Sequence, residues 1–146
     1  MHAKTILLVE DNPDDQVLTL RALQQADRAV EVTAVRDGTE AIDFLTASGS
    51  HAGRDPRQLP GLVLLDLKLP KIDGIEVLRR IRADARTRRL PVVVLTTSTE
   101  ERDIAGCYLH GANSYIRKPV DFAEFSNVLR HVAHYWLEVN EPPPVP

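Results

Sequence analysis

The stretch Leu62-Val63-Leu64-Leu65, followed directly by Asp66, decides the fold class of this chain. Its four strand residues are all apolar, with no alternation between polar and apolar positions. Strands that are buried on both faces have this pattern, as in a parallel sheet covered by helices. Thr5–Val9 and Val92–Leu95 share it. The three runs therefore predict the central strands of a parallel sheet.

Two more polar runs, Val30–Val35 and Ser114–Arg117, are weaker strand candidates, and we expect the second at an edge of the sheet. Segments of helical period lie between and after the five runs. Five strand-then-helix units in series require right-handed crossovers and helices on both faces. The predicted fold is an α/β, doubly wound, five-stranded parallel sheet with five helices.

Local features predict where the helices begin and which sides they bury. Asn12-Pro13-Asp14-Asp15 combines an N-cap residue, a proline at the first helical position and an acidic first turn. The fourth helix is predicted to open with a capping box, Ser98-x-x-Glu101, and to end at Gly111. The predicted inner face of the first helix is Val17, Leu20, Leu23 and Ala26. In the third helix we expect Ile75, Leu78 and Ile81 inside and Arg79, Arg80 and Arg82 largely outside.

Composition places the chain among ordinary globular proteins. It has 146 residues, 43% of them hydrophobic and 27% charged, which fits one domain. No run approaches the ~20 apolar residues of a membrane span. Met1–Lys4 leads straight into an apolar run and Cys107 is the only cysteine, so we expect a cytoplasmic protein without a secretory signal. The net charge of −3 predicts no binding to nucleic acid.

Two segments are predicted to lie outside the regular elements. Ser48–Gly61 is a predicted surface loop, and Glu141–Pro146 is a proline-rich tail that we expect to be disordered. We therefore assign residues 1–140 to a single domain with an extended C-terminal helix.

Polar residues follow the predicted strands at the points where the strands end. Glu10-Asp11 follows the first strand, Asp66 the third, Thr96 the fourth and Lys118 the fifth. In a doubly wound sheet, ligands bind beyond the carboxyl ends of the strands, so we expect these groups at one rim. Three close carboxylates repel one another unless a cation is bound, and few hard oxygen ligands suit Mg²⁺. A carboxylate can also act as a nucleophile toward phosphorus, with metal and lysine neutralising charge.

Four motifs in succession resemble those of response-regulator receiver domains. They are Val9-Glu10-Asp11, Leu65-Asp66-Leu67-Lys68-Leu69-Pro70 with Asp73-Gly74, Leu95-Thr96-Thr97-Ser98, and Tyr115-Ile116-Arg117-Lys118-Pro119. The resemblance runs from about Lys4 to Val132 and includes every motif in order. It implies a CheY-like sheet of order 2-1-3-4-5 and a function in two-component signal transduction.

The resemblance also implies a role for each polar residue at the rim. Asp66 would accept a phosphoryl group from the phosphohistidine of a sensor histidine kinase or from a small phosphodonor. Glu10, Asp11, Asp66 and the backbone carbonyl of Lys68 would hold Mg²⁺. Glu10 stands where many family members have aspartate, and its extra methylene favours contact through water. Lys118 would pair with the phosphoryl group.

Two further residues would transmit the signal in such a domain. Thr96 would move to hydrogen-bond the phosphoryl group, and Tyr115 would turn inward after it. The change would reach the surface of the fourth helix, fifth strand and fifth helix. The signal would leave by contact with a target protein or by onward phosphotransfer.

The C-terminal run indicates a subgroup and an interface. His134-Tyr135-Trp136-Leu137-Glu138-Val139, followed by prolines, resembles receiver-only regulators that partner bacterial phytochrome histidine kinases. Tyr135, Trp136 and Val139 continue the apolar stripe of the fifth helix beyond the usual end of a receiver. Because exposed aromatic patches mark many interfaces, we expect a homodimer that uses the fifth helix and its extension.

Three other functions share parts of this pattern. An aspartyl phosphatase would need a second acid two residues after Asp66, where this chain has Lys68. A flavodoxin would need a hydroxyl- and glycine-rich loop after the first strand, where Glu10–Asp15 would repel a phosphate. The remaining alternative is a degenerate receiver that acts as an unphosphorylated interaction module. All the required side chains are present, which favours the phosphoacceptor.

Overall fold

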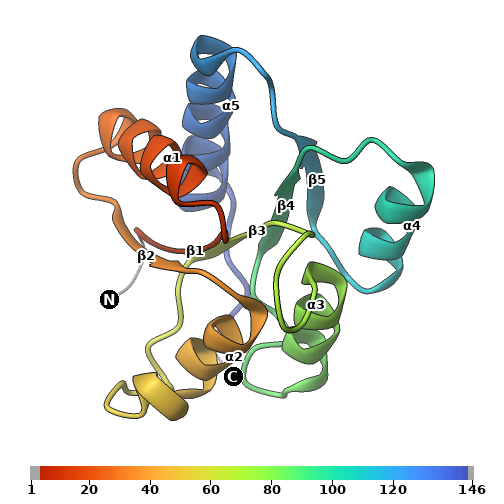
Figure 1. Ribbon diagram of the computed structural model, residues 1–146. Helices are drawn as coiled ribbons and strands as arrows, with labels where there is room; N and C mark the ends of the chain where they lie inside the picture. Colours follow the sequence, from red (N-terminus) through yellow and green to blue (C-terminus); the bar gives the residue numbers. More distant parts are fainter. Residues whose placement is uncertain (1–3, 145–146) are drawn as a thin grey trace.

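A five-stranded parallel sheet forms the centre of the computed structural model, which describes residues 4–144 (Figure 1). Its strands are β1 (Thr5–Val9), β2 (Glu31–Val35), β3 (Leu62–Leu65), β4 (Val92–Thr96) and β5 (Ser114–Arg117). Their order across the sheet is β2-β1-β3-β4-β5, and all neighbours are parallel. The predicted fold class and strand order are confirmed, and β5 lies at an edge.

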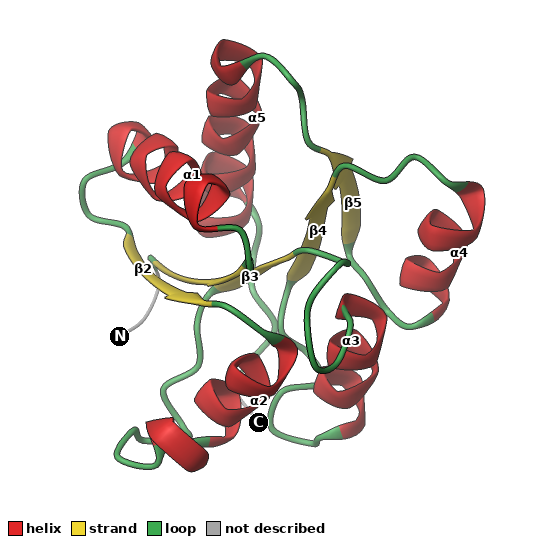
Figure 2. Ribbon diagram, viewed as in Figure 1, coloured by secondary structure: helices red, strands yellow, loops and turns green. Residues whose placement is uncertain are grey.

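Helices cover both faces of this sheet, as the colouring by secondary structure in Figure 2 shows. They are α1 (Pro13–Ala26), α2 (Gly38–Thr46), α3 (Gly74–Ala83), α4 (Glu101–Leu109) and α5 (Phe122–His134). α1 and α5 pack on one face, and α2, α3 and α4 pack on the other. A 3-10 turn, η1 (Gly49–His51), follows α2, and a π-helical turn, η2 (Tyr135–Val139), continues α5. Within residues 4–144, no helix has the length and apolar character needed to span a membrane.

Successive residues of the central strands point to opposite faces of the sheet and are buried on both. Leu7 and Leu65 lie in the core beneath α2, α3 and α4, whereas Ile6 and Leu64 lie in the core beneath α1 and α5. This two-sided burial explains why Leu62–Leu65 is apolar without alternation. The edge strands β2 and β5 are partly exposed, and their sequences are accordingly more polar.

The hydrogen-bond ladder continues for one residue beyond three of the strands. Glu10, Asp66 and Lys118 each donate a backbone N–H to the last carbonyl of a neighbouring strand, over 3.0, 3.1 and 2.7 Å. Because parallel strands end at the same side of a sheet, these bonds fix the three residues at one rim. Main-chain pairing, rather than loop conformation, therefore sets where the polar groups begin.

The inner face predicted for α1 is confirmed at Leu20 and Leu23, which lie in or against the core, and is wrong at Val17. Val17 is 52% exposed, and the buried residues of the helix are Thr19, Ala22 and Leu23. α1 packs against α5 as well as against the sheet. Its buried side faces both the sheet and α5, and Ala22 and Leu23 lie in the core between them.

Arg82 of α3 is likewise placed differently from the prediction, because it does not point outward. Its guanidinium donates to the backbone carbonyls of Leu90 (2.7 Å) and Gly111 (2.8 Å) and to the side chain of Asn113 (2.9 Å). Those groups precede β4 and β5. A guanidinium with five donors can serve several such carbonyls at once, so Arg82 ties α3 to two neighbouring connections.

The start of α4 also differs from the predicted capping box. The helix begins at Glu101, after an N-cap residue, Glu100, whose side chain makes no capping hydrogen bond. Ser98 instead accepts the backbone N–H of Glu100 (3.3 Å) and donates its hydroxyl to Asp103 (2.6 Å). The predicted end is confirmed, since Gly111 follows the helix with a φ of 97°, the left-handed conformation that glycine favours.

The C-terminal extension is partly packed on the domain. Trp136 and Leu137 lie against the core beneath α1 and α5, whereas Tyr135 and Val139 are 47% and 56% exposed. Of the predicted apolar stripe, Trp136 is thus covered and Tyr135 and Val139 are open, while Leu137, which was not predicted to belong to it, is also covered. Residues 141–144 are exposed, while residues 145–146 of the predicted tail lie outside the described residues. The domain boundary at residue 140 and the disorder of the tail stay predictions.

Candidate functional site

The end of β1 holds the first two acidic residues of the rim. The Glu10 side chain turns inward and is almost fully buried, and its Oε2 accepts the backbone N–H of Asn12 (3.1 Å). The Gln16 side chain of α1 donates to the backbone carbonyl of Glu10 (2.7 Å). Asp11, the next residue, is exposed. The two neighbours therefore offer one buried and one accessible carboxylate.

Asp66 follows β3, and the loop to α3 folds tightly around it. Its Oδ1 accepts the backbone N–H of Leu67 (2.7 Å) and, more distantly, that of Lys68 (3.4 Å). Gly74 opens α3 against the same segment, because a Cβ there would lie 2.4 Å from the Asp66 carbonyl oxygen. The backbone N–H of Gly74 donates to the Leu67 carbonyl (2.8 Å). These contacts fix the orientation of the Asp66 carboxylate.

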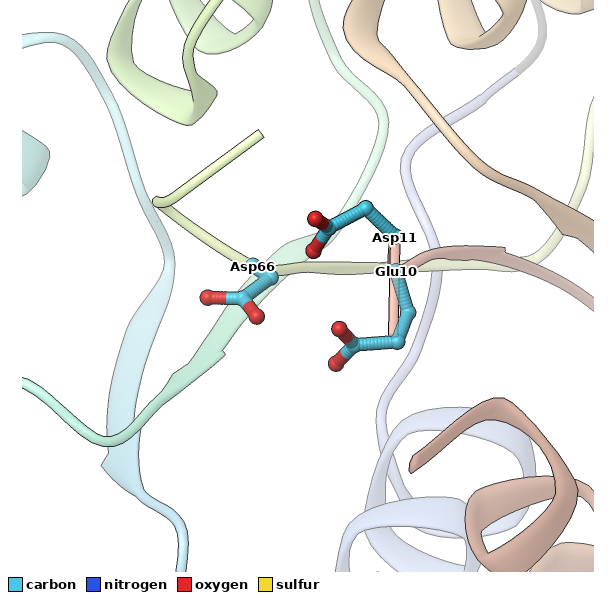
Figure 3. Close-up of side chains that lie close together, drawn as sticks. All are labelled: Glu10, Asp11 and Asp66. Atoms are coloured by element: carbon cyan, nitrogen blue, oxygen red, sulfur yellow. The ribbon is translucent and has the colours of Figure 1, made fainter. Parts of the chain in front are cut away.

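The three acidic side chains form a cluster that fits a divalent metal ion. One carboxylate oxygen from each of Glu10, Asp11 and Asp66 lies within 4.8 Å of the other two. Figure 3 shows the side chains around a common space, with Glu10 and Asp11 coming from the end of β1 and Asp66 from the end of β3. Hard, charged oxygen donors of this kind suit a small divalent cation that keeps further positions for water or phosphate oxygens.

Lys118 lies beside this cluster and contacts two of its members. Its Nζ is 2.5 Å from Oε1 of Glu10 and 3.2 Å from Oδ2 of Asp66. A third carboxylate, that of Asp15 in the first turn of α1, lies 3.3 Å away. Only 8% of the lysine side chain is exposed. This single ammonium therefore offsets part of the negative charge of the three carboxylates.

The pKa values of Glu10 and Lys118 are shifted by burial and by the charges close to them. Burial raises the pKa of Glu10 to about 7, helped by the charge of Asp66 and opposed by the hydrogen bond from Lys118. Burial alone would lower the pKa of Lys118, but the bond to Glu10 and the nearby carboxylates raise it to about 12. The lysine therefore stays charged at neutral pH, whereas burial makes the charged form of Glu10 less favourable than that of an exposed glutamate.

Thr96 and Tyr115 lie near the rim but are not joined by a direct bond. Thr96 is 1% exposed, and its hydroxyl accepts the backbone N–H of Ser98 over 3.4 Å. The Tyr115 hydroxyl donates to the carbonyl of Ser98 (2.9 Å), and its burial raises the pKa of the phenol. Both side chains therefore meet at Ser98, which connects β4 to α4.

The structure brings together four of the predicted residues, namely Glu10, Asp11, Asp66 and Lys118. It places Thr96 and Tyr115 on the adjoining β4 and β5 strands, and their roles stay predictions. Asp15 was not among the predicted site residues and was expected only as an acidic residue at the start of a helix. The position of Asp15 in a well-capped first turn, close behind the rim residues Glu10 and Asp11, was the available signal.

Comparison with protein families adds a second line of support. Residues 6–130 match the model of the response regulator receiver domain. The matched range contains every residue of the rim.

Individual proteins are similar over nearly the whole chain. Identity is 43% over 138 residues with the "Probable methanogenesis regulatory protein FilR2" of Methanothrix harundinacea, covering 94% of this chain and 86% of that protein. It is 39% over 135 residues with the response regulator Rcp1 of Synechocystis, covering 92% and 90%. The Mn²⁺-bound form of Rcp1 superposes with a TM-score of 0.87 at 37% identity, covering 97% and 99%. The phosphorylated cyanobacterial phytochrome response regulator RcpA superposes with a TM-score of 0.90 at 40% identity, covering 99% and 100%.

Proposed function

Because this chain belongs to the response regulator receiver domains, the phosphoaccepting proteins of two-component signal transduction, we propose that Asp66 is the residue that accepts the phosphoryl group. One observation carries the proposal. The Asp66 carboxylate lies 3.2 Å from the ammonium of Lys118 and within 4.8 Å of a carboxylate oxygen of Glu10 and one of Asp11. A nucleophile, a metal-binding cluster and a cation for the phosphoryl oxygens thus meet at one point.

Asp66 suits the acceptor role better than its acidic neighbours. Glu10 is 2% exposed, with one oxygen bonded to Lys118 and the other to the backbone of Asn12. A donor protein cannot reach it. Asp66 has one oxygen oriented by the backbone N–H of Leu67 and the other facing Lys118, so an incoming phosphoryl group meets a fixed nucleophile with a cation beside it.

The reaction we assign is transfer from a phosphohistidine. An oxygen of Asp66 attacks phosphorus, the bond between phosphorus and the histidine nitrogen breaks, and its electron pair leaves with that nitrogen. The product is an acyl phosphate on Asp66. Lys118 neutralises charge on the phosphoryl oxygens, which is the main contribution that a protein makes to phosphoryl transfer beyond alignment.

We assign Mg²⁺ as the metal. Glu10, Asp11, Asp66 and the backbone carbonyl of Lys68 would hold it, and it would neutralise phosphoryl oxygens that the lysine does not reach. Support comes from the all-oxygen donor set and from the similarity to Rcp1, which has a Mn²⁺-bound form.

The output that we propose runs through Thr96, Tyr115 and the surface of α4, β5 and α5. Thr96 would turn to the phosphoryl group and thereby displace Ser98, to which the Tyr115 hydroxyl is bonded. α4 buries only Cys107 among its residues, so little packing opposes its movement. Local phosphate contacts would in this way shift an element that has two positions.

The partners that we propose are a sensor histidine kinase, specifically a phytochrome, and a target or phosphotransfer protein downstream. The similarity to the phytochrome response regulator RcpA supports the first. A kinase of this type acts in the cytoplasm, where the free thiol of Cys107 also suits the reducing conditions. A second copy of the chain would bind through α5 and η2, where Tyr135 and Val139 are exposed.

The test is phosphorylation by acetyl phosphate with Mg²⁺, measured as intact mass for the wild type and Asp66→Asn. We expect a phosphate adduct on the wild type alone, and no adduct after chelation of the metal. Asp14→Asn, an exposed acid outside the cluster, is the matched control and should be modified like the wild type. Beryllofluoride binding accompanies the assay, because rapid hydrolysis could hide the adduct. If the wild type shows neither a phosphate adduct nor beryllofluoride binding, the acceptor function is contradicted. The protein would then be an interaction module that works without phosphorylation.

A further inference from the structure

Asp15 gives the site a fourth carboxylate, which approaches Lys118 from α1. Its position is set by the start of that helix. The side-chain oxygen of Asn12 accepts the backbone N–H groups of Asp14 (2.9 Å) and Asp15 (3.1 Å), and Pro13 occupies the first helical position. This cap fixes the first turn of α1. The carboxylate of Asp15 then lies 3.3 Å from Nζ of Lys118.

The three carboxylate partners of Lys118 differ in what else they contact. Glu10 and Asp66 both belong to the cluster that fits a metal ion, whereas Asp15 does not. A divalent cation bound by Glu10 and Asp66 would neutralise much of their negative charge. Asp15 would then be the partner whose charge remains available to the lysine.

Burial separates Asp15 from its partners as well. The side chains of Lys118 and Glu10 are 8% and 3% exposed, but that of Asp15 is 39% exposed. Asp15 therefore lies on the solvent side of the ammonium. A phosphoryl group on Asp66 would approach the same ammonium from within the site.

We propose that Asp15 is a positioning residue, which holds the ammonium of Lys118 on the α1 side of the site and competes for it with the phosphoryl group on Asp66. This inference rests on the proposed function of Asp66. It assigns to Asp15 a regulatory effect, because a stronger hold on the lysine makes the phosphorylated state less favourable.

Removing the negative charge of Asp15 should weaken the binding of a cation and strengthen the binding of an anion at the site. Without the Asp15 charge the site attracts Mg²⁺ less, while Lys118 is freer to bind the oxygen or fluorine atoms of a phosphoryl mimic. A change that only disturbed the packing of α1 would weaken both kinds of binding. The pair of measurements therefore separates an electrostatic role from a structural one.

The experiment compares Asp15→Asn with Asp14→Asn by calorimetric titration of Mg²⁺ and, at saturating Mg²⁺, of beryllofluoride. Both variants remove one negative charge from the first turn of α1, but Asp14 is exposed and outside the contacts of Lys118. We expect Asp15→Asn to bind beryllofluoride about two- to fivefold more tightly and Mg²⁺ more weakly by a similar factor, the size expected for a partly exposed charge pair. Asp14→Asn should leave both affinities near those of the wild type.

Two results would overturn the inference. Either equal affinities in the two variants or weaker beryllofluoride binding in Asp15→Asn would show that Asp15 does not compete for the lysine. The NMR signal of the Lys118 ammonium in metal-free protein tests the contact itself, and it should change in Asp15→Asn and not in Asp14→Asn. If beryllofluoride does not bind even the wild type, the proposed acceptor function of Asp66 is wrong. If it binds the wild type but the two variants behave alike, only the role of Asp15 is wrong.

Discussion

α3 and α4 follow neighbouring strands and begin at the same rim, yet they are held in very different ways. α3 is capped by Asp73, whose side chain accepts the backbone N–H of Glu76 (2.9 Å), and it buries Gly74, Val77, Leu78 and Ile81. α4 begins without a side-chain cap and buries only Cys107. Its Leu109 is 80% exposed.

The difference assigns separate tasks to the two helices. The start of α3 presses against the backbone of Asp66 and must stay fixed for the carboxylate cluster to keep its geometry. α4 connects to the rim through Ser98, which contacts Thr96, Tyr115 and Asp103. Elements with few buried apolar contacts open at low free-energy cost. Under the proposed function, α3 would hold the acceptor Asp66 in place while α4 would move in response to its phosphorylation.

The largest effect should come from replacing the glycine of α3, compared with the same replacement in α4. Gly74→Ala would place a Cβ 2.4 Å from the Asp66 carbonyl oxygen, so we expect a loss of about 4 kcal/mol in the free energy of unfolding and loss of beryllofluoride binding. Gly106→Ala in α4 would meet only the flexible end of Ile75, at 3.1 Å, and should stay within about 1 kcal/mol of the wild type. Urea denaturation followed by Trp136 fluorescence measures both, and similar losses would refute the contrast.

Truncation of one leucine in each helix comes next. Leu78 of α3 is fully buried, so Leu78→Ala should cost about 3 kcal/mol of unfolding free energy through lost packing and a cavity. Leu109→Ala in α4 should change stability by less than about 0.5 kcal/mol because that side chain is already in solvent. A large loss in Leu109→Ala, measured by the same denaturation, would mean that α4 is held by contacts at its exposed side.

Thiol labelling sharpens the contrast without denaturant. Cys107 is buried and is the only cysteine of the chain, so a thiol reagent reports the opening of α4. Val77→Cys in a Cys107→Ala background reports the opening of α3. After correction for the reactivity of each unfolded thiol, we expect Cys107 to react about tenfold faster. Equal rates would indicate that both helices open only on global unfolding.

The smallest effect is a pH dependence confined to α4. Burial, together with the charge of Asp103, raises the pKa of Cys107 from 9.0 to about 11. The folded state therefore holds the thiol proton more tightly than the unfolded state does. This difference contributes to the free energy of unfolding in full below pH 9, and the contribution is lost as the pH rises from 9 toward 11. At pH 9.5 the loss should be less than about 1 kcal/mol. Subtracting the same curve for Cys107→Ala isolates the thiol, and identical slopes would contradict this shift.

The sequence predicted the sheet well because burial on both faces leaves a simple pattern. Leu62–Leu65 and Val92–Leu95 are apolar without interruption, and such runs have few other interpretations. The rim residues followed from the same logic, since the carboxyl ends of parallel strands must meet. Glu10, Asp66 and Lys118 could therefore be grouped before any coordinates were known.

The errors arose where distant contacts decide the outcome. Val17 fits the apolar helix face that Leu20 and Leu23 form, but it lies at the edge of that face and is exposed. Arg82 resembles its exposed neighbours in sequence, and its partly buried position depends on hydrogen-bond acceptors before β4 and β5, among them the carbonyls of Leu90 and Gly111. Asp15 meets Lys118 across 103 positions of the chain. A local pattern can place such a residue on a helix turn, but it does not name the distant partner.

The main-chain bonds beyond β1, β3 and β5 have a consequence for protein engineering. Glu10, Asp66 and Lys118 are placed by the sheet itself, through one N–H each. The placement of these three residues is therefore largely independent of the identity of α4, which takes part in none of these bonds. A chimera that exchanges α4 and its flanking loop for those of another receiver should keep its phosphoryl chemistry. It should at the same time bind a different target protein.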